Sequence, residues 1–100
     1  MNIYKKALYD KYFITPETIK EALKDSDWMI KIHAMKEPNA SLGNIYQALE
    51  DWNPFVRKAA LIHPKATYAV DLYVLFADCD WMLKRIALNK IFMRLINFYH

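Results

Sequence analysis

The chain repeats itself with a period of about 26 residues, and this periodicity limits its possible folds more than any other feature. Residues 22–41 read ALKDSDWMIKIHAMKEPNAS and residues 48–67 read ALEDWNPFVRKAALIHPKAT, and the two segments align without a gap at an offset of 26. A third copy follows after one inserted residue, so its offset is 27. A unit this short buries its apolar face only against a neighbouring unit, so the sequence predicts a stack of units.

Each unit carries the start and stop signals of two short helices. Side chains that can accept hydrogen bonds from the free N–H groups of a helix start recur at matching positions: Thr15, Ser41 and Thr67 for first helices, and Asp27, Asn53 and Asp80 for second helices. Pro16 and Pro54 then suit the first helical position, which needs no N–H. Pro38 and Pro64 stop two second helices. The expected helices end near Lys24, Lys36, Glu50, Ile62, Ala77 and Tyr99.

The expected fold is all-α, a short α-solenoid in one domain. Apolar residues follow i, i+3, i+4 spacing, as at Ile19, Ala22 and Leu23, which favours helices over strands. With 55% hydrophobic residues among 100, the chain has enough apolar material for one core. The expected segments are a leading half-repeat over 1–14, repeats over 15–40, 41–66 and 67–90, and an extension of the last helix over 91–100.

An aspartate, five residues and then a basic residue occur together three times, as DSDWMIK, DWNPFVR and DCDWMLK, with alanine three residues after each basic residue. This pattern resembles the HEAT repeat signature. The short period and the proline-bearing links EPNAS and HPKAT bring it closest to the leucine-rich repeat variant family, a HEAT-like family.

The resemblance implies a right-handed superhelical stack that presents a concave surface to partners. It also implies a ladder of ion pairs between adjacent units, with structural roles for Asp25, Asp51, Asp78, Lys31, Arg57 and Lys84. Some leucine-rich repeat variant proteins hold an iron–sulfur centre on a cysteine cluster. This chain has only Cys79, so we do not carry that function over.

Several chemical functions lack the residues that they need. The chain has one glycine, Gly43, so phosphate-binding loops and dinucleotide fingerprints are absent. One cysteine allows neither an internal disulfide nor a zinc module. His33, His63 and His100 have no serine or cysteine at a spacing that suggests a nucleophile and its base. We therefore expect no enzyme activity, no metal and no cofactor.

Basic residues recur at two neighbouring repeat positions. The first column is Lys5, Lys31, Arg57 and Lys84, and the second is Lys6, Lys58 and Arg85. Stacked on one face, they could follow a nucleic-acid backbone, unless the ladder aspartates neutralise the first column. The net charge of +3 does not lie along the whole stack, because residues 81–100 hold four basic residues and no acidic one.

The tryptophans and the last helix are further candidates. Trp28 and Trp81 occupy equivalent positions and Trp52 lies one residue earlier, either as recognition residues or as fillers between units, with Trp52 expected to be the most exposed. The last helix has more apolar residues than one stripe needs, although a terminal repeat is usually capped by a polar face. It either covers the end of the core or binds a partner or a second copy.

The sequence favours a small non-enzymatic protein-binding module, an adaptor or stoichiometric inhibitor, over the alternative of nucleic-acid backbone binding. The partner-binding candidates are Trp52, Arg57, Lys58, Lys84, Arg85, Phe92, Arg94, Leu95, Phe98 and Tyr99. The partner is expected to be another protein, with self-association through the last helix or nucleic acid as alternatives. No apolar stretch reaches the roughly 20 residues that span a bilayer, and the start lacks the apolar segment of a secretory signal, so we expect a cytoplasmic protein with no membrane partner.

Overall fold

A computed structural model describes residues 14–98, which form six α-helices. They are α2 (Pro16–Ala22), α3 (Trp28–Met35), α4 (Leu42–Leu49), α5 (Pro54–Leu61), α6 (Tyr68–Ala77) and α7 (Trp81–Phe98). No strand occurs between residues 14 and 98, so the all-α class is confirmed. The expected leading half-repeat, apart from Ile14, and the candidate residue Tyr99 lie outside the described residues.

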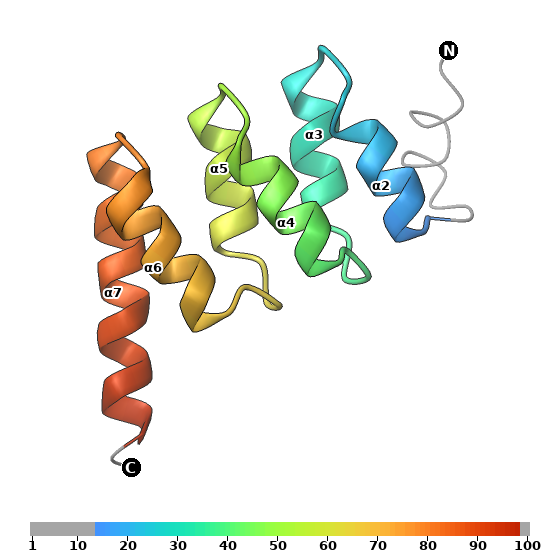
Figure 1. Ribbon diagram of the computed structural model, residues 1–100. Helices are drawn as coiled ribbons and strands as arrows, with labels where there is room; N and C mark the ends of the chain where they lie inside the picture. Colours follow the sequence, from blue (N-terminus) through green and yellow to red (C-terminus); the bar gives the residue numbers. More distant parts are fainter. Residues whose placement is uncertain (1–13, 99–100) are drawn as a thin grey trace.

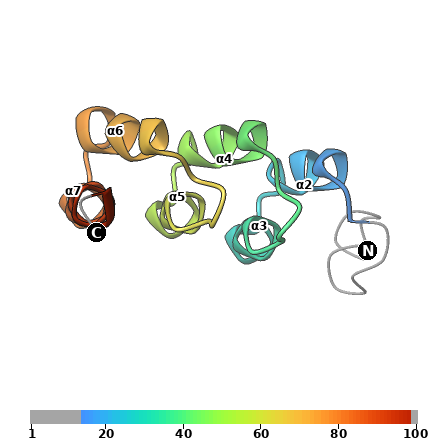
Figure 2. The same ribbon diagram turned by 90° about the horizontal axis from the view of Figure 1, so that it is seen from below.

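The helices lie in two layers. Figure 2 shows α2, α4 and α6 in one row and α3, α5 and α7, seen end-on, in the other. Each helix of the first row packs on the next helix of the chain, which gives three helix pairs: α2–α3, α4–α5 and α6–α7. The pairs follow one another in chain order (Figure 1), and α3 packs on α5 as α5 packs on α7. The principal extents are 47 × 29 × 16 Å.

Each described helix begins after a capping side chain. In α2, α4 and α6 the cap accepts a hydrogen bond from the N–H three residues on, as Thr15 does from Thr18. In α3, α5 and α7 the donor is the N–H two residues on, as Met29 is for Asp27. Such a cap contributes about 1 kcal/mol, which matters because short helices are marginal alone. The six predicted caps are confirmed: Thr15, Asp27, Ser41, Asn53, Thr67 and Asp80.

Four helices, α2 to α5, end one or two residues before their predicted ends. After α2, the N–H groups of Lys24 and Asp25 bind the carbonyls three residues back, on Glu21 and Ala22. This tighter turn satisfies the last carbonyls and turns the chain toward the next helix. Of the other two helices, α6 ends at the predicted residue, Ala77, and α7 is described as far as Phe98.

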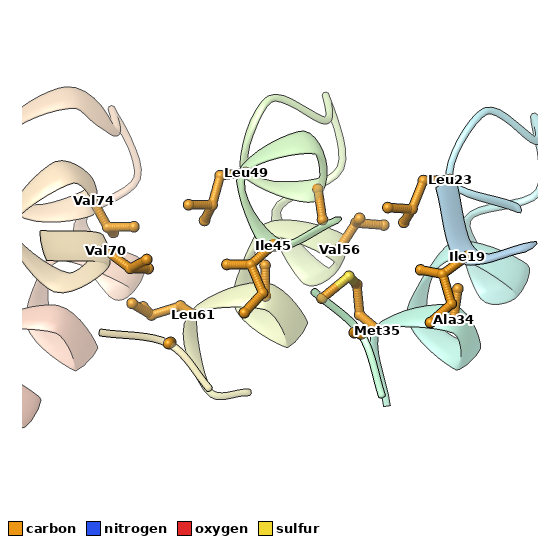
Figure 3. Packing of buried hydrophobic residues seen from close by; sticks show 14 of the residues in the cluster. Ile19, Leu23, Ala34, Met35, Ile45, Leu49, Val56, Leu61, Val70 and Val74 are labelled. Atoms are coloured by element: carbon orange, nitrogen blue, oxygen red, sulfur yellow. The ribbon is translucent and has the colours of Figure 1, made fainter. Parts of the chain in front are cut away.

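The core is one continuous cluster between the layers, to which all three helix pairs contribute (Figure 3). Equivalent positions of α3, α5 and α7 supply large apolar side chains, Ile30, Val56 and Leu83. One turn later each of these helices has an alanine with 0% exposure: Ala34, Ala60 and Ala87. The small side chain at this position lets neighbouring helices approach closely, so the spacing of the pairs depends on it.

We expect Ala60→Leu to destabilise the protein, because the larger side chain has no room in a fully packed site. The free energy of unfolding, measured by urea titration, should fall by about 1–3 kcal/mol. The control is Ala69→Leu on the exposed side of α6, where the larger side chain extends into solvent. It should change the free energy of unfolding by less than about 0.5 kcal/mol. Equal effects of the two substitutions would contradict this account of the packing.

Candidate protein-binding surface

An aspartate at the corner of one helix pair binds a cation of the preceding pair. Lys31 Nζ lies 2.6 Å from Asp51 Oδ2, and Arg57 Nε lies 2.8 Å from Asp78 Oδ2. These side chains are largely buried, so water screens the ion pairs less than it screens a surface pair. Each aspartate also accepts, through Oδ1, the N–H two residues on, which fixes the turn before the next helix. The predicted ladder is confirmed at these two positions. It is not formed at Lys84, which makes no ion pair with a described residue, and Lys5 of the same basic column lies outside the described residues.

Polar side chains also link successive pairs away from the ladder. The Asn44 amide donates to the carbonyl of Pro16 at 3.1 Å, so a buried side chain of α4 holds the start of α2. The Tyr73 hydroxyl of α6 donates to the Glu50 carboxylate at the end of α4. This hydrogen bond and, to a smaller extent, burial raise the pKa of Tyr73 above the ordinary value of 10.0. The links position each pair on the one before it.

A single buried carboxylate fastens α7 to α6. Asp71 is 0% exposed, with Lys90 Nζ 2.8 Å from Oδ1 and Arg94 Nε 2.8 Å from Oδ2. Arg94 also donates to the carbonyl of Ala66 at 2.8 Å, and Lys90 donates to that of Leu61. A buried charge is tolerated only when it is paired in this way. Arg94, a predicted partner-binding residue, is therefore engaged within the protein.

The third helix pair exposes apolar side chains at positions that are buried in the first two pairs. Leu23 and Leu49 are 6% and 5% exposed, whereas the equivalent Phe76 is 79% exposed. Leu61 is 0% exposed and its equivalent Leu88 is 56% exposed. The buried residues belong to the core cluster, which continues into the following pair. Among the described elements, none covers this side of α6 and α7.

The exposed surface continues along α7. Exposed residues recur at steps of four and three, so they share one face of the helix: Trp81, Arg85, Leu88, Phe92 and Leu95. The Lys84 ammonium lies over the Trp81 ring, 5.0 Å from its centroid. An open hollow is lined by α7 side chains that include Arg85 and Phe92. We call this surface the end face, and it comprises Phe76, Trp81, Lys84, Arg85, Leu88, Phe92 and Leu95.

The structure brings four predicted site residues together on the end face: Lys84, Arg85, Phe92 and Leu95. Trp52 is 98% exposed in the link between α4 and α5, and Lys58 lies on α5, so both belong to the middle pair. Phe98 is exposed near the end of α7. Arg57 is held by Asp78 and by two main-chain carbonyls, so its guanidinium is engaged within the fold.

Three end-face residues were not among the predicted sites: Phe76, Trp81 and Leu88. The repeat alignment contained the signal for two of them, because Phe76 and Leu88 align with Leu49 and Leu61, and the residues after Leu88 extend the last helix and do not begin another unit. The prediction that Trp52 is the most exposed tryptophan is confirmed. The interpretation of the tryptophans as buried fillers is wrong for Trp52 and for Trp81, which is 75% exposed.

Comparisons with protein-family models, with curated proteins and with solved structures found no significant match to this chain. Within residues 14–98, no group of three or more His, Cys, Asp and Glu side chains is placed to hold a metal ion. None of the described helices is both long and apolar enough to cross a membrane.

We expect Asp71→Asn to loosen α7, because it leaves two partly buried cations without their anion. The free energy of unfolding should fall by about 3 kcal/mol, at the low end of the cost of breaking a buried pair, since Lys90 and Arg94 both reach solvent. Hydrogen exchange should accelerate first in residues 88–98.

Glu17→Gln, at an exposed position of α2, removes one carboxylate without removing a described ion pair and serves as the control. Its effect on stability should stay below about 1 kcal/mol, the most that an exposed carboxylate in the first turn of a helix usually contributes. Unchanged exchange in α7 of the Asp71→Asn protein would contradict the role given to this carboxylate.

Proposed function

We propose that this chain is a small protein-binding module, an adaptor or stoichiometric inhibitor, that acts through the end face. The observation that carries the proposal is the exposure of Phe76 and Leu88, whose equivalents are buried in the first two helix pairs. Monomeric proteins rarely expose a continuous apolar surface unless it binds something. Aromatic side chains such as Phe92 and Trp81 are also typical of the centres of protein interfaces.

We further propose that the helix pairs form a short α-solenoid of HEAT-like repeats, closest to the leucine-rich repeat variant family. In support, the pairs follow one another in chain order (Figure 1), and the pairing of Lys31 with Asp51 recurs one period later as Arg57 with Asp78. A terminal solenoid repeat usually presents a polar outer face, whereas the outer face of the last described helix pair is largely apolar. A bound protein would cover this apolar face.

Nucleic-acid backbone binding has less support. A groove that follows phosphates needs several free cations, because each phosphate contact adds a small electrostatic contribution. In the described chain, Lys31 and Arg57 are paired with ladder aspartates, and Lys90 and Arg94 are paired with Asp71. Of the predicted cations in residues 14–98, only three lack a carboxylate partner: Lys58, Lys84 and Arg85. We expect the module to act in the cytoplasm, where the exposed thiol of Cys79 would stay reduced.

Affinity capture from nuclease-treated lysate of the source organism tests the proposed function. We expect the wild-type chain to retain a specific protein, and the double variant Leu88→Glu, Phe92→Glu to lose it, because both carboxylates would have to be buried in the interface. The matched control is Trp52→Glu with Ile62→Glu, two exposed apolar residues of the middle pair. This control should retain the same protein.

Two outcomes would contradict the proposal. Capture that is insensitive to the end-face substitutions would place binding elsewhere on the chain. Capture that disappears after nuclease treatment would favour the nucleic-acid alternative, and such binding should also weaken steeply as salt is raised. Circular dichroism and thermal unfolding of each variant show whether a loss of binding reflects loss of the fold.

A further inference from the structure

Among the described residues, the ladder of ion pairs stops at a cation that has no carboxylate partner. Lys31 pairs with Asp51 of the second helix pair, and Arg57 pairs with Asp78 of the third. Lys84 occupies the next equivalent position, and within the described residues it makes a cation–π contact with Trp81 and no ion pair. The third pair thus carries the cation of a ladder ion pair, and its carboxylate partner is absent from the described residues. The same ion pair is complete at two other positions of the chain.

The apolar contacts stop at the same boundary. The Trp28 ring of the first pair lies 6.1 Å from the Phe55 ring of the second, centroid to centroid. Trp81 is the equivalent of Trp28 and is 75% exposed, with no ring of a following pair beside it among the described residues. Together with the exposed Phe76 and Leu88, it leaves uncovered the kind of surface that a following helix pair covers elsewhere in the molecule.

The spacing along α7 also points to a helical partner. The exposed stripe Trp81, Arg85, Leu88, Phe92 and Leu95 advances by alternating steps of four and three residues. This is the spacing of a helix that packs lengthwise against another helix. Leu88 is equivalent to the last residues of the shorter helices α3 and α5. The stripe continues past Leu88 to Leu95, so it is longer than the surface that α3 or α5 could present.

A second copy of this chain does not supply the missing carboxylate. The end face carries two cations, Lys84 and Arg85, and α7 contains no acidic residue, so two end faces would bring together cations alone. In a head-to-tail arrangement the residue equivalent to Asp51 and Asp78 is Asp25. Asp25 is already engaged in an interaction of its own.

We infer that the end face binds an acidic helical segment of another protein, which occupies the place that a further helix pair would take. This inference rests on the proposed function and specifies its partner. A carboxylate of the partner pairs with Lys84 or Arg85, and its apolar side chains cover Phe76, Leu88 and Phe92. Burial of the apolar stripe supplies most of the affinity, while the charges select an acidic partner over a basic one.

Two synthetic helical peptides of about three heptads, with the same leucine positions, test this inference. One peptide carries Glu beside the leucines and the other carries Lys. Fluorescence anisotropy with the full chain should give a Kd for the acidic peptide at least tenfold below that for the basic peptide. The double variant Lys84→Glu, Arg85→Glu should reverse this preference, because the end face would then carry carboxylates in place of cations. Neither cation has a carboxylate partner among the described residues, so the substitutions break no ion pair there.

The control is Lys36→Glu with Lys65→Glu, which changes the net charge equally at two exposed positions away from the end face. It should keep the preference for the acidic peptide. The inference is overturned if neither peptide binds, or if both bind equally. It is also overturned if light scattering shows a dimer that Leu88→Glu dissociates, because a second copy would then occupy the face.

The two proposals can fail separately. Capture of a protein through the end face, combined with no binding of the acidic peptide, overturns the inference about the partner and leaves the proposed function in place. Peptide binding that the Leu88→Glu, Phe92→Glu variant does not weaken overturns the inference, because the peptide would then bind outside the end face.

Discussion

The two ladder aspartates join local structure to long-range packing, and the arrangement of the helix pairs depends on them. Oδ1 of Asp51 or Asp78 holds the turn that leads into the next helix, and Oδ2 receives the cation of the preceding pair. A carboxylate can do both at once because it has two acceptor oxygens. Because the turn orients the carboxylate that binds the ladder cation, the fold of one pair and its docking on the previous pair support each other.

Within the third pair a buried carboxylate joins α6 to α7, in addition to the ladder contact between Arg57 and Asp78, and this explains why α7 is longer than α3 and α5. Asp71 takes the position at which α4 has the neutral Asn44, and both side chains are buried. A buried carboxylate needs cations, and Lys90 and Arg94 belong to α7 only because this helix continues past Leu88, the position equivalent to the last residue of α5. The extension is thereby fixed along one side, and its opposite side carries the exposed apolar stripe.

The sequence was sufficient for features that arise from chemistry within one unit or between adjacent units. Caps such as Thr15 and Asn53 follow from local hydrogen bonding, and the ladder followed from a recurring spacing together with a family resemblance. The network at Asp71 was not predicted, because it occurs once and has no periodic signal. Arg94 was assigned to partner binding because a sequence shows a charge without the carboxylate that a distant segment brings to it. Arg57 was assigned both to the ladder and to partner binding, and its ion pair with Asp78 engages it in the ladder.

The charges of the end face prevent one kind of association as much as they favour another. An apolar surface that resembles the chain's own internal interface would tend to stack with further copies. Lys84 and Arg85 oppose an arrangement in which two end faces meet, because it would bring cations against cations in a partly desolvated contact. The same two residues would favour a partner that carries carboxylates. Under the proposed function, specificity at this surface comes from the cations that have no carboxylate partner among the described residues, and the apolar residues around them strengthen the contact.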